Sequence, residues 1–74
     1  MKFIVIELQT NTDGSVGNLV YSYDTRAEAE SKYHAVLSTA AVSALPIHAA
    51  VLMDNTGIVY GQQMYEHTTE APAK

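Results

Sequence analysis

The side chains that could do chemistry in this 74-residue chain include three histidines, and the chain has no cysteine. His34, His48 and His67 lack the spacing of a metal-binding motif, and without cysteine there is no thiolate ligand. We therefore predict that the protein has no metal site. The histidines are expected to be partly exposed surface residues.

Serine, histidine and aspartate are all present, but no sequence pattern brings them together. The chain contains no GxSxG, GxGxxG or GxxxxGK[ST] motif and no carboxylate pair in a recognisable setting. We predict that the protein is not an enzyme and needs no cofactor. A small enzyme is the least favoured alternative.

The chain is rich in tyrosine, with five residues, at positions 21, 23, 33, 60 and 65. Tyrosine suits half-buried strands and protein interfaces as well as ligand pockets, so a core or interface role is favoured. The alternative is a pocket for a small nucleotide-like ligand, with aromatic side chains beside cationic ones. Its candidate ligand-binding residues are Tyr23, Arg26, Lys32 and Tyr60.

The formal net charge is −4, and the four basic residues are scattered along the chain. Proteins that bind duplex nucleic acid usually carry a basic stripe, so we predict no binding of that kind. The apolar run at the N-terminus is broken by Glu7, and no stretch has the length of a membrane span. A cytoplasmic protein that does not bind membranes is expected.

One segment, residues 25–44, has a clear helical period. Thr25 and Glu28 have the spacing of a capping box, and Pro46 ends the helix. The apolar stripe of this helix consists of Ala29, Tyr33, Val36, Leu37, Ala40 and Ala44.

Residues 3–8, 19–23, 47–53 and 58–65 have the composition of strands, with turns at Asp13-Gly14 and at residues 54–57. Gly61 indicates a bulge or a close approach by a neighbour. The order β-β-α-β-β predicts an α+β fold of two layers, in which one amphipathic helix covers a four-stranded antiparallel sheet. Residues 1–66 form this single domain, and residues 67–74 are predicted to be a disordered tail.

The predicted strands are apolar on both faces, whereas one helix covers only one of them. We therefore predict a homo-oligomer, most simply a two-fold dimer formed through the surplus apolar face or an edge strand. The candidate interface residues are Phe3, Val5, Ala50, Leu52 and Tyr65. The alternative is that residues 10–18 and the tail partly cover the patch.

The segments VYSYDTRAEAESKYHAVLSTAAVS and PIHAAVLMDNTGIV resemble a group of short phage and prophage proteins of gut Firmicutes. The resemblance spans Phe3 to His67 and includes no catalytic or binding signature. It implies a phage accessory protein, working in the host cytoplasm against host defence by binding a host protein or sequestering a small nucleotide-like molecule. A virion-associated structural or assembly protein is the alternative.

Overall fold

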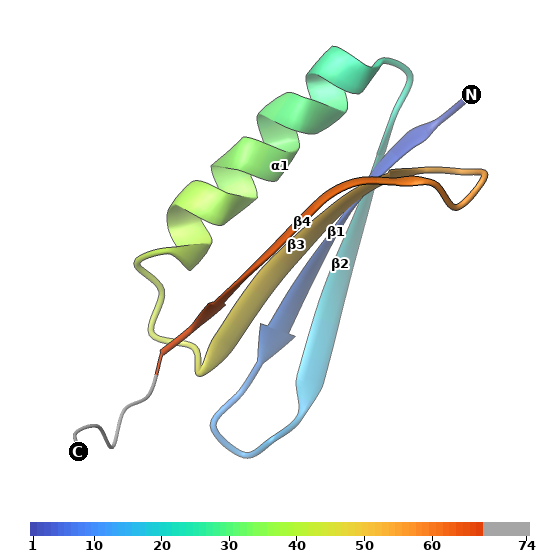
Figure 1. Cartoon of the computed structure of the whole chain (residues 1–74). Helices are drawn as coiled ribbons and strands as arrows, with labels where there is room; N and C mark the ends of the chain where they lie inside the picture. The colour runs from blue at the N-terminus through green and yellow to red at the C-terminus, as the bar shows by residue number, and fades with distance from the viewer. Residues whose placement is uncertain (68–74) are drawn as a thin grey trace.

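The computed structural model describes residues 1–67, which form one antiparallel sheet and one helix (Figure 1). The strands are β1 (Phe3–Thr10), β2 (Val16–Tyr23), β3 (Ile47–Asp54) and β4 (Val59–Glu66), and the helix is α1 (Arg26–Ala40). The strand order is β2-β1-β3-β4, so β2 and β4 are the edges. The predicted two-layer α+β fold is confirmed.

The predicted C-terminal tail lies almost wholly outside the described residues, which end at His67. This residue, the first of the predicted tail, donates its backbone N–H to the carbonyl of Pro46 at 2.7 Å. Its ring Nε2 lies 2.9 Å from the carbonyl oxygen of Ala40. The described fold therefore includes His67, one residue beyond the predicted domain boundary.

Strand β2 begins three residues earlier than the sequence indicates, at Val16 instead of Leu19. The connection from β1 is a compact turn in which Gly14 has a φ of 89° and Asn11 donates its N–H to the carbonyl of Ser15 at 2.8 Å. Glycine adopts this backbone conformation without steric cost. A turn this short and exposed leaves no long loop to cover the sheet.

Helix α1 begins as predicted, with Thr25 as its N-cap. The Thr25 hydroxyl accepts a hydrogen bond from the backbone N–H of Glu28 at 3.3 Å. The helix ends at Ala40, and the chain then turns towards Pro46, so Ala44 is exposed beyond the helix. Within residues 1–67 no helix is long and apolar enough to cross a membrane.

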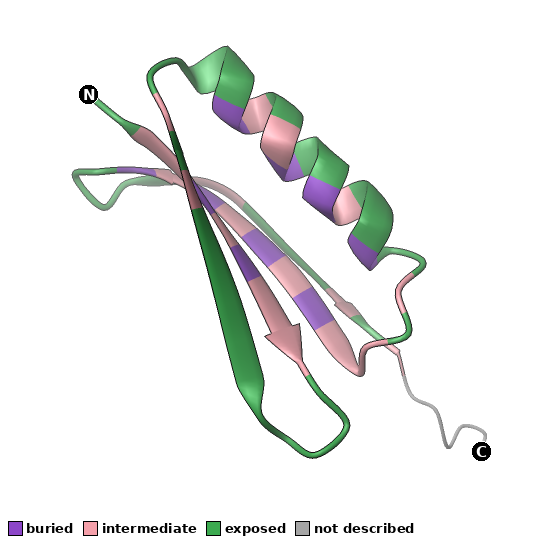
Figure 2. Ribbon diagram, turned by 180° about the vertical axis from the view of Figure 1, so that it is seen from behind, coloured by how far each residue is buried: buried purple, intermediate pink, exposed green. Residues whose placement is uncertain are grey.

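The core lies between α1 and one face of the sheet (Figure 2). Val5, Ala50 and Leu52 from the sheet pack against a helical stripe whose buried residues are Ala29, Tyr33, Val36 and Ala40. The stripe is confirmed apart from Ala44 and the half-buried Leu37.

The predicted interface residues are wrong as a set, because they belong to the face that α1 covers. Val5, Ala50 and Leu52 are at most 3% exposed within a single chain. Phe3 packs against the same core, and the strand register places Tyr65 opposite the buried His48. The surplus apolar surface must therefore be the other face of the sheet.

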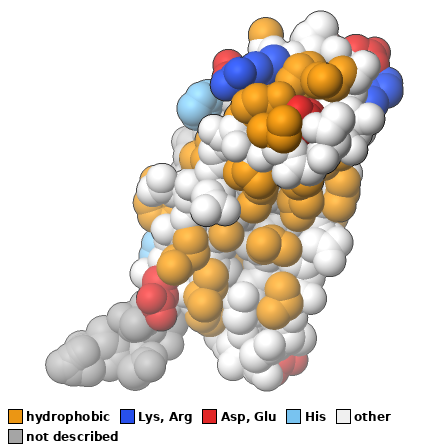
Figure 3. Space-filling view, turned by 45° about the vertical axis from the view of Figure 1, so that its right-hand side comes forward, with side chains coloured by type: hydrophobic (Ala, Val, Ile, Leu, Met, Phe, Trp, Pro, Cys, Tyr) orange, Lys and Arg blue, Asp and Glu red, His pale blue; other side chains and the backbone are white. Residues whose placement is uncertain are grey.

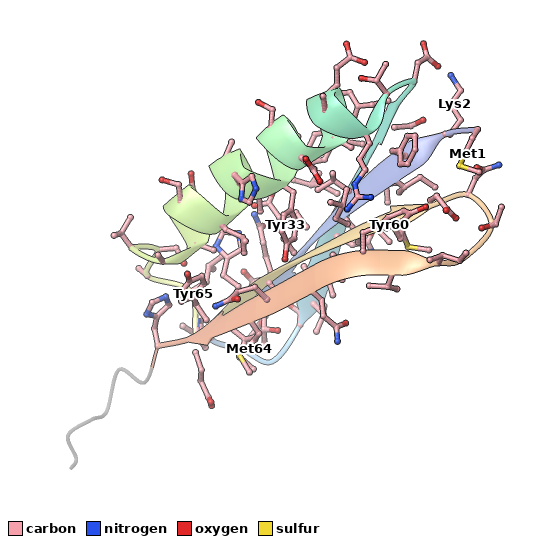
Figure 4. All side chains as sticks on the ribbon, turned by 45° about the horizontal axis from the view of Figure 1, so that its top comes forward. Met1, Lys2, Tyr33, Tyr60, Met64 and Tyr65 are labelled. Carbon is pink, nitrogen blue, oxygen red and sulfur yellow. The ribbon has the colours of Figure 1, made fainter. Side chains whose placement is uncertain are left out.

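Strand β4 contains a bulge that reorients Tyr60. Leu52 pairs with Gly61 and Met53 with Val59, so Tyr60 is an extra residue without a partner in β3. Tyr60 lies on the helix side of the sheet, where its ring centroid is 6.0 Å from that of Phe3. Strict alternation along β4 would place Tyr60 on the same face as Met64, whereas Figure 4 shows the two side chains on opposite sides.

Gly61 lies directly beneath the Tyr33 ring, as the contact distances show. A Cβ atom at position 61 would be 3.2 Å from the Tyr33 hydroxyl oxygen and 3.4 Å from the adjacent ring carbon. The predicted close approach by a neighbour is confirmed. A larger residue here would push α1 away from the sheet.

We predict that Gly61→Val lowers the free energy of unfolding by about 1–3 kcal/mol, because the added side chain overpacks the contact with Tyr33. The matched control is Gly17→Val, where a Cβ would meet nothing within 4 Å. Urea unfolding measures both. Adding Tyr33→Phe should recover part of the Gly61→Val loss, and an equal effect of both glycine substitutions would contradict the proposed contact.

Candidate functional site

The face of the sheet opposite α1, which we call the open face, is predominantly apolar. The strand register assigns it alternate residues of each strand, and its middle is formed by the two central strands. Its apolar members are Ile4, Ile6 and Leu8 of β1; Val16 and Val20 of β2; Ile47, Ala49, Val51 and Met53 of β3; and Val59 and Met64 of β4.

Polar side chains on the open face lie towards its margins. Among the residues that the register of the described strands places there, Glu66 is the only charged one. An ion pair between Lys2 and Asp24 follows beyond one end of the strands. Figure 3 shows hydrophobic side chains across the middle and charged ones towards the ends. An apolar centre with a polar rim is the usual composition of a protein interface.

The open face is hollowed beside Ala49. A shallow hollow of about 380 Å³ is lined there by Leu8, Val51, Gln62 and Met64 among others. The small Ala49 side chain lies between larger neighbours, which explains the depression. Such a hollow can accept an apolar side chain from a second protein surface.

The four candidate ligand-binding residues do not form one site. Arg26 lies over the Tyr60 ring, with its guanidinium carbon 4.4 Å from the ring centroid. Lys32 lies over Tyr21 instead, at 4.2 Å. Because Tyr60 is on β4 and Tyr21 and Tyr23 are on β2, the two groups lie at opposite edges of the sheet.

Each basic residue within residues 1–67 already has a partner. Lys2 pairs with Asp24, Arg26 donates from Nε to Glu30 at 2.9 Å, and Lys32 contacts the Tyr21 ring. A phosphate-bearing ligand would have to displace these contacts and would meet the nearby carboxylates. Within one chain, this geometry does not favour an anion site.

Four of the five tyrosines form part of the core or pack against it, in line with the favoured interpretation of the sequence. Tyr33 belongs to the buried cluster, and Tyr21, Tyr23 and Tyr60 pack against it. The Tyr60 hydroxyl donates to the buried carboxylate of Asp54, as does that of Thr56. These hydrogen bonds lower the pKa of Asp54 to about 2, so that it stays ionised where β3 ends.

A buried carboxylate–imidazole pair, which the sequence did not indicate, lies beneath α1. Nε2 of His48 is 2.6 Å from a carboxylate oxygen of Glu7, and Gln9 donates to the same oxygen at 3.0 Å. His48 is 2% exposed, so the prediction of a partly exposed histidine is wrong at this position. The residues meet diagonally across β1 and β3, since Glu7 pairs with Ala50 and His48 with Gln9.

The pair is held in one arrangement by its surroundings. Burial disfavours the charged carboxylate, but the hydrogen bonds and the positive charges nearby outweigh this effect and lower the pKa of Glu7 below its ordinary value of 4.5. Nδ1 of His48 has no hydrogen-bond partner among the described residues.

A carboxylate next to an imidazole can orient a general base, but this pair lies within the core. The side chains of His48 and Glu7 are 3% and 10% exposed, respectively. The structure also shows no group of three or more metal-ligating side chains within residues 1–67. In this arrangement the pair joins the two central strands beneath the helix.

A scan against protein-family models and searches of curated proteins and of solved structures found no match. The resemblance to phage proteins therefore stays a prediction.

We predict that Glu7→Gln reduces the acid sensitivity of the fold. A carboxyl whose pKa is lowered on folding stabilises the native state above its unfolded pKa, and this contribution is lost as the pH falls through the folded pKa. The free energy of unfolding of the natural sequence minus that of Glu7→Gln should therefore decrease from pH 6 to pH 3.

Urea unfolding at a series of pH values measures this difference. The other carboxyl groups titrate in both proteins, so the subtraction cancels their contribution to the pH dependence of the free energy of unfolding. A difference that stays constant between pH 6 and pH 3 would contradict a Glu7 carboxylate stabilised by His48.

Proposed function

We propose that this protein is a non-enzymatic, self-associating binding module in which a second copy covers the open face. The observation that carries the proposal is the apolar, almost uncharged surface on β1 and β3 opposite the helix. A single chain leaves this surface facing solvent. Apolar patches of this size on small proteins usually mark interaction sites.

The area of the open face is sufficient for a dimer. Four strands spaced about 4.8 Å apart, each rising about 3.3 Å per residue, give a footprint of roughly 500 Å². The accessible area of a corrugated surface exceeds its footprint, which brings it near the roughly 800 Å² per partner of a standard interface. Two sheets packed face to face are a common architecture.

The charge distribution makes the open face a suitable surface for contact with a second copy. The chain carries a formal charge of −4, so two copies repel each other wherever their charged surfaces meet. Glu66 is the only charged residue that the register of the described strands places on the open face, so contact through this face brings few like charges together. An isologous contact through this face also keeps the rim charges at its periphery.

The resemblance to phage proteins supports an anti-defence role in the host cytoplasm, exerted on a host protein or a small nucleotide-like ligand. Between these, the geometry favours a host protein, because the described cations are already engaged with Asp24, Glu30 and Tyr21. Native mass spectrometry of protein isolated from infected cells separates the two. A retained small molecule that Arg26→Ala releases would support ligand sequestration instead.

We expect Val51→Glu to reduce the mass of the assembly, because a charge in the middle of the open face cannot be desolvated against its copy. The matched control is Ala35→Glu, on the exposed side of α1. Native mass spectrometry and size-exclusion chromatography measure the mass, and circular dichroism checks the fold. Val51→Thr, which keeps the shape and the strand preference, should weaken association more mildly.

A natural protein that is monomeric at high micromolar concentration would contradict the proposal. So would a Val51→Glu variant that is folded and assembled as before. If association is unaffected but Val51→Glu no longer co-purifies with phage particles, the open face binds a virion component, and the structural alternative is correct.

A further inference from the structure

Strand β2 is an unprotected edge of the sheet. Six of its eight residues are exposed, including Val16, Leu19 and Val20, which are 62%, 48% and 61% exposed (Figure 2). None of the eight residues is charged or proline. An edge strand of this kind presents a row of unpaired backbone donors and acceptors that pair readily with another strand.

The opposite edge, β4, is protected in ways that β2 is not. Its bulge at Tyr60 interrupts the regular ladder, and Glu66 places a charge at its end. Bulges and charged residues are the usual means by which edge strands avoid pairing. The two edges therefore differ, and β2 is the one suited to pairing.

We propose that β2 pairs antiparallel with β2 of a second copy, joining two four-stranded sheets into one continuous sheet. This interface is additional to the open face, and it rests on the proposed function in requiring self-association. A two-fold axis perpendicular to the sheet relates the strands, so both helices lie on the same side. The two open faces then form one wider apolar surface.

The side chains of β2 fit a pairing centred on Val20. In this register each Val20 faces its own copy, and Leu19 faces the second copy's Tyr21. Gly17 faces Tyr23, which places an aromatic ring over a glycine, a favourable cross-strand pair. An uncharged strand also suits a second copy of an acidic chain, because the pairing brings no like charges into contact.

Combining the two interfaces gives a tetramer, a dimer of edge-paired dimers packed through their open faces. Each interface is isologous. The two-fold axis of the edge pairing is perpendicular to that of the open-face contact, and together they close the assembly. The chain thereby covers its open face and its unprotected edge with copies of itself. The outer surfaces of the helices are left free for other partners.

Native mass spectrometry of four variants tests this arrangement. Leu19→Lys places a charge at the paired edge but not on the open face, and should convert the tetramer into a dimer. Val42→Lys is the matched control, since Val42 is 83% exposed beyond the end of α1, and it should leave the tetramer intact. Val51→Glu should give a dimer. The double variant that combines Val51→Glu with Leu19→Lys should be a monomer.

Disulfide trapping tests the register, and the natural chain has no cysteine to interfere. In the Val51→Glu background, Val20→Cys should crosslink under mild oxidation, because facing Cβ atoms lie about 4.5–5.5 Å apart. Asn18→Cys is the control. Its two copies would be separated by about 13 Å along the strands, which exceeds the roughly 7 Å limit between Cα atoms for a disulfide.

The outcomes separate this inference from the proposed function. The natural protein could be a dimer that becomes monomeric with Val51→Glu and is unchanged by Leu19→Lys. This result would overturn edge pairing and support the open-face contact. A natural dimer that becomes monomeric with Leu19→Lys and is unchanged by Val51→Glu would support edge pairing and overturn the open-face contact. A natural protein that is monomeric would overturn both interfaces. Disulfide formation by the Asn18→Cys variant, with none by the Val20→Cys variant, would overturn the proposed register.

Discussion

Helix α1, with 15 residues, is the one helix within residues 1–67, and it excludes water from only one of the two faces of the sheet. Val5 and Leu52 are buried beneath it, whereas Ile6 and Val51, paired on the other face, are not covered by any described element. Burial of apolar surface is the main driving force of folding, and a chain this short has little of it. Covering the second face is therefore the most direct way to supplement the stability of the fold.

Close contact between the helix and the sheet depends on a few specific positions. Gly61 leaves room for the Tyr33 ring, and the bulge brings Tyr60 beneath Arg26. The contact between Glu7 and His48 gives each of these buried side chains a polar partner in the core. These features let one helix make a dense core with the sheet and leave the open face as the region suited to association.

Much of the fold could be predicted from the sequence, because its signals are local. The Thr25 cap, the helical stripe and the turn at Gly57 each depend on residues close together in the chain. Which strand face the helix covers is not a local property. The prediction from the sequence assigned the face that contains Val5 and Leu52 to an interface between copies, whereas the structure places this face beneath α1, where Glu7 pairs with His48. The bulge at Tyr60 likewise shifted a face assignment that strict alternation had predicted.

Coverage of the open face by a second copy can be tested with an isotope-filtered NOE experiment. A sample mixed from ¹³C-labelled and unlabelled chains reports only contacts between copies. Contact between two open faces predicts intermolecular NOEs among the methyl groups of Ile6, Val51 and Met53. A folded assembly whose intermolecular NOEs come only from the outer side of α1, or a sample with none at all, would contradict it.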